Sequence, residues 1–89
     1  MSTPTSLDAD ELDIDDLRLE IDRLDAEILA AVKRRTEVSQ AIGKVRMASG
    51  GTRLVLSRER EIVERFREAL GADGTQVALL LLRAGRGPL

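Results

Sequence analysis

Two residue types that carry much of enzyme chemistry are missing from this 89-residue chain, which has no cysteine and no histidine. The first absence excludes disulfide bonds, thiolate nucleophiles and cysteine metal sites, and the second removes the commonest general base and metal ligand. Phe66 is the single aromatic residue, so surfaces for stacking nucleic-acid bases are also lacking. We therefore expect no disulfide framework and no nucleic-acid partner.

Long hydrophobic runs are absent as well, and charge is unevenly placed. No apolar stretch approaches the ~20 residues of a membrane-spanning helix, and no signal-peptide pattern opens the chain. Residues 1–27 hold ten acidic and two basic residues, whereas residues 28–89 hold six acidic and twelve basic ones. We expect a soluble, cytoplasmic protein with no membrane partner, whose later segment offers a basic cleft for a small anion.

One helical stripe dominates the first half of the chain, where apolar residues recur at alternating steps of three and four. Its members are Ile14, Leu17, Ile21, Leu24, Ile28, Ala31, Val38, Ile42 and Val45. A helix over 14–47 is about 51 Å long, whereas a compact globule of this chain length has a radius of gyration of about 12 Å. Because the stripe extends beyond any core that one chain can build, we predict an intertwined homodimer with antiparallel long helices.

The pattern predicts an all-α fold of three helices, one long and two short, and no strand. Within a domain at 13–87, we expect helices at 14–47, 58–70 and 76–84. The third is apolar all round and is expected to be buried against the other two. We expect a flexible tail at 1–12 and a short C-terminal tail at 88–89.

The predicted helix ends depend on capping residues. Asp13 is a candidate N-cap for the first helix, and Ser57 for the second. Gly71 is expected to end the second helix, and the third is expected to begin after a cap within 73–75. The glycines of 85–87 are not expected to extend the third helix.

Arginines are the candidate site residues. Arg35 interrupts the apolar stripe, where a charge is costly unless an anion meets it. Arg46 lies eleven residues later on the same face, roughly 16 Å away. Arg18 lies about 42 Å from Arg46 along the same helix, so the two can share a ligand only across an antiparallel dimer. This predicts two sites per dimer, each mixing chains.

The second helix opens with Arg58 and Glu59, a guanidinium fork beside a carboxylate that can accept a hydroxyl hydrogen bond. Structural alternatives without a ligand remain open for these residues. In the alternative reading, Arg18 and Arg58 are solvated surface residues, and the Arg35 side chain extends past the interface into solvent. Glu59 then only stabilises the N-terminus of its helix.

Several segments in this order resemble the all-helical (AroQ-class) chorismate mutases, in particular the short intracellular actinobacterial branch. The resemblance covers about residues 14–87. The segments that carry it are Leu17–Asp25, Lys33–Arg35, Ile42–Arg46, Met47–Val55, Ser57–Glu59 and Leu81–Gly87.

The resemblance implies rearrangement of chorismate to prephenate, the committed step toward phenylalanine and tyrosine, a pericyclic reaction that needs no cofactor and no metal. By position, Arg35 and the partner chain's Arg18 would hold carboxylates, and Arg46 would donate to the ether oxygen. It further implies that Arg58 grips the second carboxylate and Glu59 orients the ring hydroxyl. Pocket-lining positions implied by the resemblance are Thr52, Val55 and Ile62.

The chain departs from the efficient members of this family in two places. They carry an aspartate at the position of Val55 and a polar residue, usually glutamine, near the ether oxygen on a longer third helix; no counterpart of that polar residue is expected here. In the actinobacterial branch, such a site goes with weak activity alone and activation by docked DAHP synthase. The resemblance therefore implies a DAHP synthase partner.

Two other functions remain open. An isochorismate pyruvate lyase shares the helical dimer, although such lyases tend to carry lysine where Arg46 stands. A non-catalytic dimerisation module explains the long stripe, but it explains neither the arginine at its centre nor the Arg58-Glu59 pair.

Overall fold

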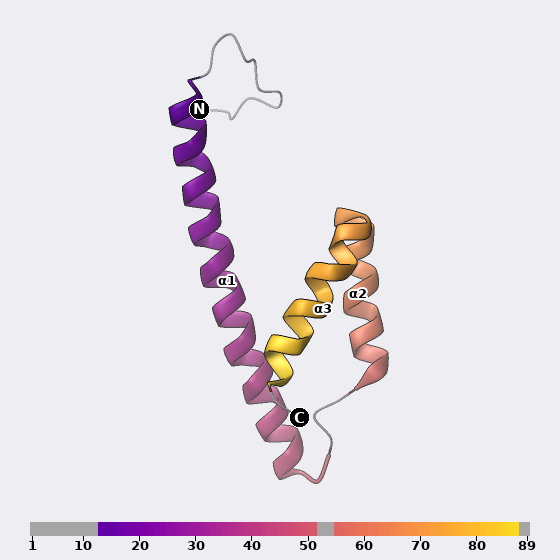
Figure 1. Ribbon diagram of the computed structural model, residues 1–89. Coiled ribbons are helices and arrows are strands. Elements are labelled where there is room, and N and C mark those ends of the chain that lie inside the picture. Colours follow the sequence, from indigo (N-terminus) through magenta and orange to yellow (C-terminus); the bar gives the residue numbers. More distant parts are fainter. Residues whose placement is uncertain (1–12, 52–54, 88–89) are drawn as a thin grey trace, which may run out of the picture. The chain divides into compact units, whose positions relative to one another are not determined.

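The computed structural model describes residues 13–51 and 55–87. These residues form three α-helices and no strand: α1 (Ile14–Ala48), α2 (Leu56–Leu70) and α3 (Ala72–Arg86) (Figure 1). The prediction of an all-α fold with one long and two short helices is confirmed. The chain divides into two compact units, Met1–Ala30 and Ala31–Leu89, and α1 continues from the first into the second.

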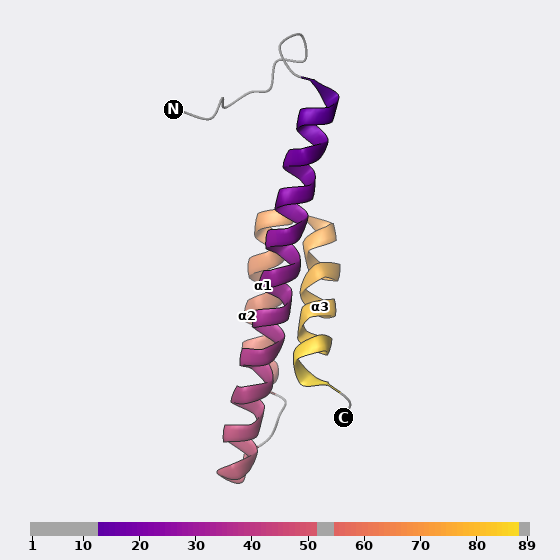
Figure 2. The same ribbon diagram turned by 90° about the vertical axis from the view of Figure 1, so that its left-hand side faces the viewer.

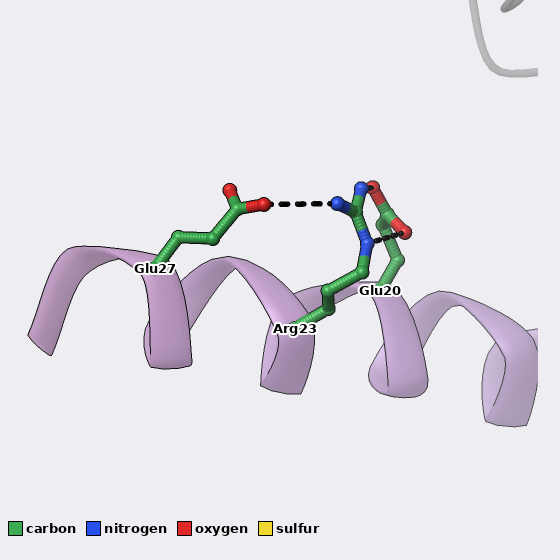
Figure 3. A network of polar contacts seen from close by, with 3 residues as sticks. All are labelled: Glu20, Arg23 and Glu27. Carbon is green, nitrogen blue, oxygen red and sulfur yellow. Dashed lines mark hydrogen bonds and ion pairs between the residues drawn. The ribbon is translucent and has the colours of Figure 1, made fainter. Parts of the chain in front are cut away.

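Local hydrogen bonds explain why α1 begins and persists where it does. The Asp13 carboxylate accepts a 2.8 Å hydrogen bond from the Asp15 backbone N–H, which confirms Asp13 as the N-cap. Further along α1, Arg23 donates to Glu20 and, over 3.1 Å, to Glu27 (Figure 3). The hydrogen bond from Arg23 lowers the pKa of Glu20, and the Glu20 bond raises the pKa of Arg23. These side chains are exposed, so they favour the helix locally without building a core.

The apolar stripe of α1 is not covered within one chain. None of the 35 residues of α1 is buried. Its large apolar side chains with more than a third of their surface exposed are Ile14, Leu19, Ile21, Leu24, Ile28, Leu29, Val38, Ile42, Val45 and Met47. Among the residues that the structure describes, no helix is both long enough and apolar enough to cross a membrane.

The core of the second unit lies between α2 and α3, which pack side by side in opposite directions (Figures 1 and 2). Ile62, Ala78 and Leu82 are its buried side chains, and Val63 and Phe66 pack against them. Ala78 and Leu82 are one helical turn apart, so a single face of α3 supplies its share of this core.

The other faces of α3 correct a prediction. Leu79 and Leu80 are exposed, so α3 is not buried all round within one chain. Its apolar run is buried at Ala78 and Leu82, on the face that meets α2, and the opposite face stays exposed.

The turn between α2 and α3 is tighter than predicted. Gly71 has a φ of +76°, a conformation open mainly to glycine, and its N–H bonds to the carbonyl of Arg67 over 2.8 Å. Gly71 as the end of α2 is thus confirmed. The same residue precedes α3, which begins at Ala72 and needs no cap within 73–75. Gly74 makes this possible, because a Cβ there would lie 2.6 Å from the Phe66 carbonyl carbon.

Two further boundary predictions are wrong. Ser57 does not cap α2, because the Glu59 N–H already bonds to the Val55 carbonyl over 3.1 Å and the helix begins at Leu56. Helix α3 does not stop at Ala84 but continues to Arg86, and Gly87 ends it with a φ of +68°. Gly85 is helical and buried, so its missing side chain permits a close approach rather than a break.

Candidate active site

The second unit contains a cavity of about 650 Å³ between the last turns of α1, the start of α2 and the end of α3. This volume is in the range of small-molecule sites. Its basic lining residues are Arg35, Lys44, Arg46, Arg58 and Arg86, and its acidic lining residue is Glu59. Apolar side chains complete the lining, among them Val38, Ile42, Val55, Ile62 and Leu82. With five cations against one carboxylate, the cavity is suited to a small, multiply charged anion.

Arg35 enters this cavity from the middle of α1. Its side chain is half-buried, and Nη1 donates a 3.3 Å hydrogen bond to the backbone carbonyl of Leu81 in α3. The charge in the apolar stripe is thus met by a carbonyl oxygen within the same chain. The remaining guanidinium donors of Arg35 are available to a ligand carboxylate.

Arg46 lies in the last turn of α1, where the chain turns sharply. The Gly51 N–H bonds to the Arg46 carbonyl over 2.8 Å, which brings Gly51 back against the helix end. A Cβ at Gly51 would lie 2.8 Å from Cγ of Arg46, so this glycine leaves room for the arginine stem. The half-buried Arg46 side chain lines the cavity.

The first turns of α2 contribute a cation and a carboxylate. Arg58 is 56% exposed and lies 3.3 Å from Glu61, and it also lines the cavity. Glu59 is 20% exposed, and both of its carboxylate oxygens accept from Nη1 of Arg86 over 2.9 Å. Arg58 and Glu59 are therefore cavity residues rather than purely surface positions.

The remaining predicted site residues are Val55, Ile62, Thr52 and Arg18. Val55 and Ile62 line the cavity, and Ile62 is also part of the α2–α3 core. Thr52 lies outside the described residues. Arg18 is not part of the cavity lining; it belongs to the first unit, where its side chain is 77% exposed and 3.9 Å from Asp15.

Sequence reasoning misses Arg86, because the glycines beside it predict the end of the third helix. Helical spacing contains the signal: Ala78, Leu82 and Arg86 recur every fourth residue, so a helix continued through Gly85 places Arg86 on the core-facing side. Among the residues that the structure describes, no group of three or more histidine, cysteine or acidic residues is placed to hold a metal ion.

Comparisons with known proteins agree with this geometry. Residues 17–81 match the family described as chorismate mutase type II. The intracellular chorismate mutase of Mycolicibacterium smegmatis is 63% identical over 86 residues, which is 97% of this chain and 82% of that protein. The intracellular chorismate mutase of Mycobacterium tuberculosis is 71% identical over 77 residues, 86% of this chain and 72% of that one.

A solved structure is similar as well. It is a non-covalent complex of DAHP synthase and chorismate mutase from Corynebacterium glutamicum with a bound transition state analog; the matched chain has a TM-score of 0.82 and 60% sequence identity, over 85% of this chain and 92% of that chain. The matching helices, the cationic cavity and these degrees of identity place the chain in the type II chorismate mutase family.

Proposed function

We propose that this protein is an isomerase that converts chorismate to prephenate in phenylalanine and tyrosine biosynthesis. The observation that carries the proposal is a cavity in which Arg35, Arg46, Arg58 and Glu59 meet, in a chain of the type II chorismate mutase family. A pericyclic rearrangement requires that a flexible dianion be held in its reactive shape and that charge developing on the ether oxygen be stabilised. Fixed guanidinium groups perform both tasks without a nucleophile.

The proposed roles follow the sites of charge on the substrate. Arg35 and Arg58 bind carboxylates through charge-assisted hydrogen bonds, and Arg46 donates to the ether oxygen as its negative charge grows. Glu59 accepts a hydrogen bond from the ring hydroxyl. Val55 and Ile62 supply apolar walls, and Thr52 is proposed as a further lining residue.

We propose that the active form is an antiparallel homodimer, built from a domain at 13–87, in which Arg18 of each chain completes the partner's site. The exposed apolar residues of α1 support the dimer, since covering them with a second copy removes apolar surface from water. The high exposure of Arg18 within one chain agrees with a role across the interface.

Mixing two inactive variants tests the shared site. Arg18→Ala and Arg46→Ala each break every site of their own homodimer, but a mixed dimer keeps one intact site. After subunit exchange at equal concentrations, we expect activity to return to about a quarter of the unaltered level, because half of the dimers are mixed and each has one working site. No recovery in dimers shown to have exchanged would contradict the shared site.

We also propose DAHP synthase as a partner that raises the activity. The Corynebacterium glutamicum complex of DAHP synthase and chorismate mutase supports this proposal, because its matched chain is 60% identical to this one. A cytoplasmic location is proposed with it, in keeping with the intracellular relatives. Titrating DAHP synthase into the turnover assay is expected to raise kcat/KM, and an unchanged rate at saturation would contradict the partnership.

The decisive experiment is turnover by the purified chain. We expect chorismate absorbance to decay and prephenate to appear by chromatography, slowly alone and faster with DAHP synthase. Isochorismate is offered in parallel, and salicylate plus pyruvate from it would instead indicate a lyase. Absence of prephenate both with and without DAHP synthase would overturn the proposed function.

A further inference from the structure

Arg86 makes the closest polar contact that spans the cavity. It is the last residue of α3, and its Nη1 lies 2.9 Å from both carboxylate oxygens of Glu59, at the start of α2. The two side chains are 25% and 20% exposed, so the pair is better shielded from water than the surface pairs on α1 and α2. An ion pair of this kind constrains side chains more strongly than an exposed one.

The position of Arg86 is fixed by close helix packing. Gly85 is buried, and a Cβ at this residue would lie 2.8 Å from Cβ of Ser39 in α1. The absence of a side chain at Gly85 lets the last turn of α3 approach α1. Arg86, the next residue, thereby reaches the cavity instead of solvent.

Charge gives this contact a consequence for ligand binding. Glu59 is the acidic member of a lining that otherwise offers cations to an anion. An uncompensated carboxylate there would repel the carboxylates of a dianion through a partly desolvated space. Arg58 is directed to Glu61, 3.3 Å away, whereas Arg86 is directed to Glu59.

Geometry leaves Glu59 able to accept another hydrogen bond. One guanidinium nitrogen meets both oxygens, and an ionised carboxylate offers about four lone-pair directions. The remaining directions are open to a ligand hydroxyl. Fixing the carboxylate in advance also spares the entropy of ordering it when the ligand binds.

We propose that Arg86 is a positioning residue that neutralises and orients Glu59, so that the cavity accepts a dianion and still presents a hydroxyl acceptor. The inference rests on the proposed function and adds a residue to it. Arg86 acts through Glu59 and does not itself bind the substrate.

A double-mutant cycle tests this coupling. Turnover of chorismate is measured for Arg86→Gln, Glu59→Gln and the double variant, with DAHP synthase at saturation throughout. We expect Arg86→Gln to raise KM about tenfold with kcat changed less than about threefold, because compensation acts equally on substrate and transition state. In the Glu59→Gln background the same change should alter KM less than about twofold, since no carboxylate remains to be compensated.

Two further variants sharpen the result. Arg86→Lys keeps the charge and should raise KM less than Arg86→Gln does. Arg83→Gln is the matched control, because Arg83 lies one turn earlier, is exposed and is not part of the cavity lining; its KM should stay unchanged. Circular dichroism verifies folding at the assay temperature, and the lysine variant carries the test if the glutamine variant loses helix.

Two outcomes would contradict the inference. A lower KM for Arg86→Gln would mean that the Arg86–Glu59 pair opposes substrate binding. An equal rise in KM with Glu59 and with Glu59→Gln would mean that Arg86 acts independently of Glu59. Either result, with the unaltered chain active, overturns this inference alone. An unaltered chain that forms no prephenate overturns the proposed function and this inference together.

Discussion

Nη1 of Arg35 in α1 donates to the carbonyl oxygen of Leu81 in α3 over 3.3 Å, a hydrogen bond between residues 46 positions apart in the chain. Arg35 lies in the apolar stripe of α1, where an unpaired charge is unfavourable. The Leu81 carbonyl compensates part of this charge within one chain. Arg35 also lines the cationic cavity, where its charge is suited to bind an anion. The same guanidinium thus contributes to both packing and binding.

Replacing Arg35 separates an enzyme from a dimerisation module. We expect Arg35→Leu to lower kcat/KM by about 10- to 100-fold, the loss of one charge-assisted hydrogen bond of about 1.5–3 kcal/mol, while the dimer persists. The control is Arg34→Leu, because Arg34 is 75% exposed and pairs with Glu37. Steady-state kinetics and sedimentation measure the two properties, and a more stable Arg35→Leu dimer with unchanged turnover would indicate a purely structural stripe.

Arg46 is expected to matter for kcat more than for KM. Its proposed partner, the ether oxygen, gains negative charge only in the transition state, so Arg46→Ala should lower kcat by about 10²–10³, or roughly 2.7–4 kcal/mol. Arg46→Lys keeps a point charge but not the planar fork and should retain part of the rate. A rise in KM with kcat unchanged would place Arg46 on a carboxylate instead.

The fold could be predicted from sequence wherever a pattern is long. The stripe of α1 continues for many turns, and Asp13 and Gly71 are ends with a clear chemical reason. The start of α2 could not be predicted, because Val55 precedes it without a side-chain cap. The start of α3 depends on how Gly74 packs against Phe66, a tertiary contact that no local pattern records.

The site was predictable only in part for a similar reason. Spacing along one helix related Arg35 to Arg46, and both line the cavity. Arg86 reaches Glu59 only because Gly85 packs closely against Ser39, which again is a contact between distant residues. The sequence pattern predicts that Gly85 ends the helix, whereas the structure buries Gly85 at a close approach of α3 to α1.

Val55→Asp is expected to stabilise the start of α2. Val55 holds the N-cap position with an extended backbone, φ −123° and ψ 97°, and makes no side-chain cap bond. An aspartate there can accept from the first free N–H groups of the helix, which typically contributes about 1 kcal/mol. Melting at equal protein concentration should rise by about 4–8 °C, and Val55→Ala is the control without an acceptor. An aspartate variant that melts no higher than the alanine variant would contradict this capping geometry.

Acid is expected to weaken the exposed ion pairs of α1 and α2. Hydrogen bonds from Arg23 and Arg67 hold the pKa of Glu20 and Glu64 below the usual 4.5. The folded state therefore favours the ionised forms, so their stabilisation is complete above about pH 4.5 and is lost as pH falls through the lowered values. Thermal melts of the unaltered chain and Glu20→Gln should differ slightly at about pH 7 and converge as the pH falls through the lowered pKa of Glu20. High salt should reduce the difference in melting temperature between the two chains at about pH 7, because it screens exposed charges. A difference in melting temperature that grows in acid would contradict a stabilising Arg23–Glu20 ion pair.

Gly85→Ala tests the approach of α3 to α1. Alanine is the better helix former by about 1 kcal/mol, but its Cβ would lie 2.8 Å from Cβ of Ser39, which cannot rotate away as a flexible side-chain end does. Overpacking of this kind costs about 1–3 kcal/mol, so we expect a net loss of stability and, with Arg86 displaced, a higher KM. In the double variant, Ser39→Gly removes the opposing side chain and should restore much of the melting temperature. This is expected because the contact between the two Cβ atoms, and not the helix propensity of residue 85, lowers the stability. A Gly85→Ala chain that melts at or above the unaltered temperature would show that the two helices do not meet this closely in solution.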